Sequence, residues 1–88
     1  MSALTEFKKA LQTLTTTVVK AEAAQGSNAD AFELQRAASV AERKQLRETH
    51  AELVAELGAS APEATLPHAT WFAQTVARAE ALFGPEPV

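Results

Sequence analysis

The sequence predicts an all-α protein, in which a long antiparallel helical hairpin carries a shorter third helix in a three-helix bundle-like arrangement. Apolar residues recur at heptad spacing over residues 2–25, which is typical of a helix packed lengthwise against another helix. Two breaks divide the chain into three stretches, and 20 of the 88 residues are alanine, the strongest helix former.

The first helix is expected at about residues 3–25. Ser2 is a candidate N-cap and Gly26 a candidate stop. Two apolar lines run along this helix at intervals of seven residues: Leu4, Leu11 and Val18 on one, and Phe7, Leu14 and Ala21 on the other. This heptad pattern predicts a buried face along the whole helix.

The second helix is expected at about residues 31–57, after the polar turn 26–28. Asp30 is the predicted N-cap, because Glu33 three residues later completes a capping box. The apolar stripe is thin in the middle: Phe32, Leu46, Leu53 and Leu57, with Ser39 in line. Two readings fit, one long helix with a half-exposed middle or a kink near Ser39. A continuous helix is favoured because no Gly or Pro enforces a break.

The third helix is expected at about residues 67–83. It follows a break at 59–66, with Pro67 at the favoured first position, and it ends before Gly84. Its apolar face is wide, because two lines lie side by side: Ala69, Phe72, Val76, Ala79 and Phe83, and then Trp71, Thr75, Arg78 and Leu82. Residues 1–84 are therefore predicted to form one helical domain, and residues 85–88 a flexible tail.

A turn of three residues between helices of about 35 and 40 Å forces an antiparallel hairpin, and the third helix, about 25 Å long, folds back along it. A chain of 88 residues has a thin core, so burial against a partner or a second copy is advantageous.

The composition of the chain argues against several classes of protein. The net charge is −3, which argues mildly against a general binder of nucleic acid or anionic membranes. The chain has no cysteine, and it shows no apolar run long enough to span a membrane and no signal-peptide pattern. We therefore expect a cytoplasmic protein without disulfides.

The residues that could carry chemistry do not converge. His50 and His68 are 18 residues apart on different predicted helices, without the spacing of a zinc pair. Glu48, Glu52 and Glu56 recur every four residues, which is typical of a solvated helix face. We expect no enzyme activity, no cofactor and no metal site.

Contact with other proteins is the favoured function: an adaptor, assembly chaperone or inhibitor that acts by helical surface contact as a homo-oligomer. The alternative is a small nucleic-acid-associated regulator that uses a basic line on the second helix. Trp71 fits either a core or an interface role. The candidate partner-binding residues are Trp71, Arg78, Leu82, Arg36, Arg43 and Arg47.

Overall fold

The computed structural model describes residues 2–86 and confirms the all-α class. Its content is 91% helix, and no strand occurs among these residues. The long helices are α1 (Ala3–Ala24), α2 (Ala29–Leu57) and α4 (Ala69–Phe83). Three short turns lie between α2 and α4: η1 (Gly58–Ser60), α3 (Ala61–Thr65) and η2 (Leu66–His68).

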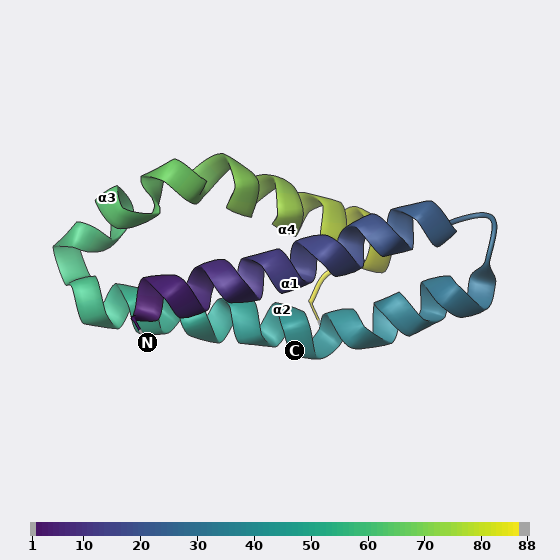
Figure 1. The fold of residues 1–88 in the computed structure, drawn as a ribbon, viewed down its shortest axis with the longest axis horizontal. Helices are drawn as coiled ribbons and strands as arrows, with labels where there is room; N and C mark the ends of the chain where they lie inside the picture. Colours follow the sequence, from purple (N-terminus) through teal and green to yellow (C-terminus); the bar gives the residue numbers. More distant parts are fainter. Residues whose placement is uncertain (1, 87–88) are drawn as a thin grey trace.

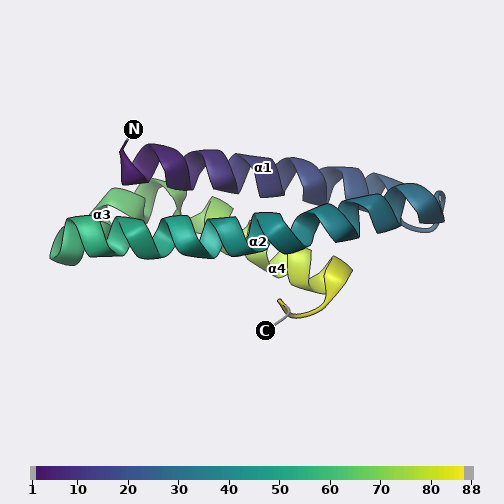
Figure 2. The same cartoon turned by 90° about the horizontal axis from the view of Figure 1, so that it is seen from below.

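Helices α1 and α2 form the expected antiparallel hairpin, which gives the molecule its elongated shape (Figures 1 and 2). The principal extents are 44 × 22 × 22 Å. Gly26 turns the chain with φ of 78°, a backbone conformation that favours glycine. The amides of Ser27 and Asn28 both donate to the carbonyl oxygen of Ala24, which satisfies the end of α1.

Local side-chain caps fix where both hairpin helices begin. Ser2 caps α1 as predicted, since its hydroxyl accepts from the amide of Thr5 at 3.2 Å. The prediction for α2 was wrong: Asn28, not Asp30, is the N-cap, and its Oδ1 accepts from the Ala31 amide at 3.0 Å. Asn28 has the extended backbone that a cap requires, whereas Asp30 already lies in the first turn, where its charge favours the helix dipole.

The heptad face of α1 is buried as predicted, and it serves two neighbours. Five of the six residues in its two apolar lines are buried, and Leu4 is half-buried against the core. Phe7 contacts both α2 and α4, with ring centroids 5.5 Å from His50 and 5.1 Å from Phe72. Thr15, which lies beside the line of Leu11, contacts α4. Helix α1 is therefore the central element.

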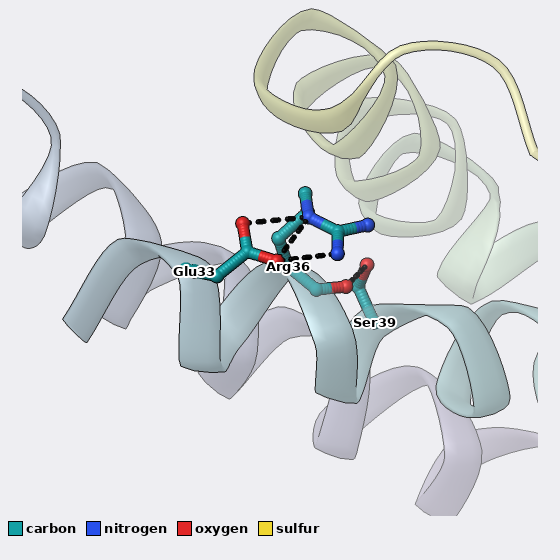
Figure 3. Close-up of polar contacts among 3 residues, drawn as sticks. All are labelled: Glu33, Arg36 and Ser39. Atoms are coloured by element: carbon teal, nitrogen blue, oxygen red, sulfur yellow. Dashed lines mark hydrogen bonds and ion pairs between the residues drawn. The ribbon is translucent and has the colours of Figure 1, made fainter. Parts of the chain in front are cut away.

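Small side chains let α1 and α2 approach closely. From Ala3 onward, every seventh residue of α1 is small and buried: Ala3, Ala10, Thr17 and Ala24. On α2, Ser39 is 1% exposed, and its hydroxyl donates to the carbonyl of Arg36 within the same helix (Figure 3). Helix α2 runs through Ser39 without interruption, and the hydroxyl of this buried serine is satisfied within the helix.

The segment between α2 and α4 is more ordered than expected. Residues 59–66 were expected to form a break, but they lie in consecutive helical turns. Pro62 and Pro67 each stand at the start of such a turn, where the missing amide costs nothing. The Thr65 hydroxyl donates to the carbonyl of Ala61 at 3.0 Å. Helix α4 itself begins at Ala69, two residues after Pro67.

Helix α4 runs back along the hairpin and packs chiefly on α1 (Figure 1). Beyond Phe83 the chain turns at Gly84 and crosses to α2. The predicted flexible tail begins at this point: residues 85 and 86 are described, and residues 87 and 88 lie outside the described residues. None of the described helices has the length and apolar character that a bilayer span requires.

Candidate interaction groove between α2 and α4

A groove lies between α2 and α4, with a volume of about 180 Å³. Its floor is apolar: Leu14, Leu46, Phe72, Val76 and Ala79. Its rim is charged or polar: Arg43, Arg47 and His50 from α2, Glu80 from α4, and Glu86 beyond α4. The combination of an apolar floor with a few polar rim groups is typical of a binding site.

Two aromatic contacts join α2 to α4 on either side of the groove residues Val76 and Ala79. At one end His50 and Phe72 lie with ring centroids 5.2 Å apart, and both contact Phe7. At the other end Phe32 and Phe83 lie 5.7 Å apart. Between these pairs α4 presents smaller side chains at Val76 and Ala79, so the two helices do not close on each other.

The chain itself crosses the groove at one end. Arg43 donates to the carbonyl oxygen of Gly84 at 2.9 Å, although its side chain is almost fully buried. Arg47 donates through Nε to Oε1 of Glu86 at 3.2 Å. Figures 1 and 2 show this short segment leaving α4 and returning to α2. We call residues Gly84–Glu86 the crossing segment.

The other two candidate arginines form ion pairs outside the groove. Arg36 pairs with Glu33 one turn earlier on α2, with Nε 2.9 and 2.8 Å from the two carboxylate oxygens (Figure 3). Arg78 pairs with Glu22 through two hydrogen bonds and thereby ties α4 to α1. These hydrogen bonds lower the pKa of both glutamates below the ordinary value of 4.5.

Trp71 lies at the contact of α4 with α1. The Trp71 indole Nε1 donates to the Thr15 hydroxyl at 2.8 Å, and the Thr15 and Thr75 hydroxyls are 3.2 Å apart. Leu82 is half-buried and packs against the core. The structure thus places Trp71 and Arg78 against α1, and Leu82 against the core.

The six candidate residues therefore fall into four places. Arg43 and Arg47 line the groove, Arg36 lies further along α2, Trp71 and Arg78 of α4 lie against α1, and Leu82 packs against the core.

The sequence analysis did not predict two structural features, the crossing segment and the contact that Thr15 makes with α4. The Gly84-Pro85 pair was a usable signal, since it redirects the chain after α4, but nothing distinguishes Thr15 from the neighbouring threonines.

Among residues 2–86 no group of three or more His, Asp or Glu side chains is placed to hold a metal ion. Glu48, Glu52 and Glu56 are exposed along α2, as expected of a solvated face. His50 packs between aromatic rings at the border of the core, and His68 lies 6.2 Å from Trp71 by ring centroids.

Known proteins give no assignment for this groove. No protein-family model, no curated protein and no solved structure matches the chain. Function is therefore inferred from the contacts, burial and charges of the described residues.

Proposed function

We propose that this chain is a non-enzymatic protein–protein interaction module, an adaptor, assembly chaperone or inhibitor that acts by helical surface contact and associates with copies of itself. The observation that carries the proposal is the groove between α2 and α4, whose apolar floor is flanked by Arg43 and Arg47. Apolar surface rimmed by polar groups is the usual character of a protein contact site. The proposal assigns no catalytic residue, cofactor or metal.

Exposed aliphatic side chains support the self-association part of the proposal. Leu34 is 68% exposed and Leu66 is 70% exposed. Val19, Val40 and Val54 are each exposed by more than two fifths. A domain of this size gains stability when such side chains are covered by a second copy.

The proposal includes the arrangement of the long helices, because the groove exists only while α4 stays docked. We infer that α1, α2 and α4 act in solution as one three-helix bundle. The Trp71–Thr15 hydrogen bond, the Arg78–Glu22 ion pair and the edge-to-face Phe7–Phe72 contact support this arrangement.

Partner capture tests the groove with a matched pair of variants. Val76→Lys places a charge on the groove floor, whereas Ala77→Lys places the same charge on the exposed face of the same helix. We expect the wild-type chain and Ala77→Lys to co-purify the same protein from the native host, and Val76→Lys to lose it. Equal recovery with both variants, identified by mass spectrometry, would remove the groove from the proposal.

Light scattering tests self-association separately. We expect a dimer or larger species at high micromolar concentration, and dissociation in the Leu34→Ser, Leu66→Ser double variant. Ala37→Ser is the control, because it also makes an exposed α2 position polar without removing a large apolar side chain. A monomer mass for the wild-type chain refutes self-association and leaves only a foreign partner.

Nucleic-acid regulation is the weaker alternative, because the arginines of α2 already have partners. Arg36 pairs with Glu33, Arg47 pairs with Glu86, and Arg43 bonds a backbone carbonyl. Binding to DNA or RNA that weakens steeply with salt, and less steeply in Arg47→Ala, would favour it. No retardation at low salt would eliminate it.

A cytoplasmic location is also part of the proposal, in keeping with the composition of the chain. Fractionation of the native host, followed by detection of the chain in each fraction, tests this location directly.

A further inference from the structure

We propose that the groove between α2 and α4 is a receptor for an acidic, non-helical segment of a partner protein, and that the crossing segment occupies part of it as a built-in competitor. This inference rests on the proposed interaction function and names the chemistry of the partner and the regulation of the site.

The crossing segment shows what the two groove arginines bind. Arg43 takes a backbone carbonyl at Gly84, and Arg47 takes a carboxylate two residues later, at Glu86. Pro85 between them fixes its own φ, and Gly84 turns the chain with φ of 80° and ψ of −176°, a conformation that favours glycine. The arginines therefore contact a non-helical stretch that presents a carbonyl and, two residues later, a carboxylate.

Arg43 makes no ion pair in the described part of the chain when the crossing segment is in place, although Glu80 and Glu86 also lie on the rim of the groove. Arg43 is 8% exposed and bonds the Gly84 carbonyl, but the ion pairs of α2 in the described part of the chain involve Arg36 and Arg47. A guanidinium has five N–H donors and is costly to bury without a negative partner. A ligand that brings a second carboxylate to Arg43 would meet this requirement.

The apolar floor gives the ligand a second point of contact. Glu86 lies at the rim, yet a volume of about 180 Å³ stays open over Leu46, Phe72 and Val76. An apolar side chain next to the acidic residue of a ligand would fill this space and displace water from it. The crossing segment offers no such side chain, because its residues are Gly, Pro and Glu.

Displacement of the crossing segment breaks the Arg47–Glu86 ion pair and the Arg43–Gly84 hydrogen bond, so the ligand must supply a new acceptor to Arg43. Arg47 and Glu86 are 61% and 30% exposed, and exposed ion pairs contribute little to stability. The crossing segment is covalently attached to the chain that carries the groove. Its effective concentration at the groove is therefore on the order of millimolar, and this is its main advantage as a competitor. For a free peptide with a Kd of about 0.1 mM, such a competitor lowers the apparent affinity about tenfold.

The test uses a fluorescent peptide that copies residues 82–88 and the full-length chain as receptor. The Glu86→Ala variant releases Arg47 without disturbing the core. We expect this variant to bind the peptide about tenfold more tightly than the wild-type chain, measured by fluorescence anisotropy. Glu52→Ala is the matched control, since it removes an exposed carboxylate of α2 outside the groove and should bind like the wild-type chain.

A second arm identifies the receptor residue. In the Glu86→Ala background, Arg47→Glu should abolish peptide binding, whereas Lys44→Glu, an equal charge change at an exposed site outside the groove lining, should weaken it little. A peptide carrying lysine in place of Glu86 should restore binding to the Arg47→Glu chain. This reciprocal charge exchange separates recognition in the groove from general electrostatic attraction.

Two outcomes overturn the inference. If Glu86→Ala and the wild-type chain bind the peptide equally, the crossing segment is not a competitor. If Arg47→Glu and Lys44→Glu weaken binding equally, the groove is not the receptor. Neither outcome affects the Val76→Lys capture experiment or the light-scattering result, so failure of this inference is distinguishable from failure of the proposed function.

Discussion

The hydroxyl of Thr15 is expected to be the polar contact that aligns α4 on α1, and Thr15→Val tests this. Valine keeps the β-branched shape, so the substitution removes the oxygen and little else. The variant loses the acceptor for the Trp71 indole N–H, at 2.8 Å, and the neighbour of the Thr75 hydroxyl, at 3.2 Å. The Leu11 carbonyl that Thr15 also bonds remains in the helical hydrogen-bond ladder.

The expected magnitude follows from burial. A buried donor left without a partner costs about 1–3 kcal/mol. Trp71 is half-buried, so the lower part of that range applies, and the added methyl group of valine offsets a few tenths of a kcal/mol. We therefore expect the free energy of unfolding to fall by about 1 kcal/mol.

Urea titration is the appropriate assay, because Trp71 is the only tryptophan and its fluorescence reports on the contact itself. Far-UV circular dichroism on the same samples reports on global unfolding. Thr16→Val is the matched control: the same change one residue later, at an exposed site whose hydroxyl bonds the Gln12 carbonyl. If the two variants lose the same stability within about 0.5 kcal/mol, the reasoning about the Thr15 hydroxyl is refuted.

Three further predictions concern other parts of the molecule. Leu14→Ala should cost about 2–4 kcal/mol in urea titration, because Leu14 is 1% exposed, whereas Leu34→Ala at an exposed site should cost little; a loss below about 0.5 kcal/mol for Leu14 would contradict its burial. Glu42→Leu should raise the melting temperature, because Oε1 of Glu42 is buried and has no hydrogen-bond partner among residues 2–86. An unchanged or lower melting temperature would show that this oxygen is hydrogen-bonded in solution. Glu22→Gln should remove a stabilisation of less than about 1 kcal/mol, since the pair with Arg78 is exposed. The pKa of Glu22 is lowered on folding, so this stabilisation is present above the ordinary value of 4.5 and is lost as the pH falls through the folded value; a difference between wild type and variant that persists at the lowest pH would contradict the pair.

Features set by local sequence were predictable. The all-α class, the buried heptad face, the Ser2 cap and the continuous α2 depend on neighbours within one or two turns. The choice between Asn28 and Asp30 as cap was missed because both residue types can cap, and the backbone angles after Gly26 decide between them. The helical turns of residues 58–68 were missed because two prolines and a glycine suggested irregular structure.

Features set by packing were only partly predictable. The two apolar lines of α1 suggested a single seam, but their residues serve two different neighbours, and periodicity alone cannot separate adjacent faces. The wide face of α4 has the same origin: one side, with Trp71 and Arg78, contacts α1, while Val76 faces the groove. Arg43 and Arg47 were visible on one helix face, but their partners lie about 40 residues away in sequence.

Because α4 docks chiefly on α1, the N-terminal hairpin and the C-terminal helix can form in separate steps of folding. A connection of four residues closes the hairpin at small entropic cost, so α1 and α2 can form first. Helix α4 docks later and can open as a separate cooperative unit while the hairpin stays intact. Such an opening uncovers Phe7 and Thr15 of α1, which contact Phe72 and Trp71 of α4 in the closed chain. The uncovered face would accept the α4 of a second copy as well as its own, so helix exchange between chains would produce the proposed self-association with the same contacts.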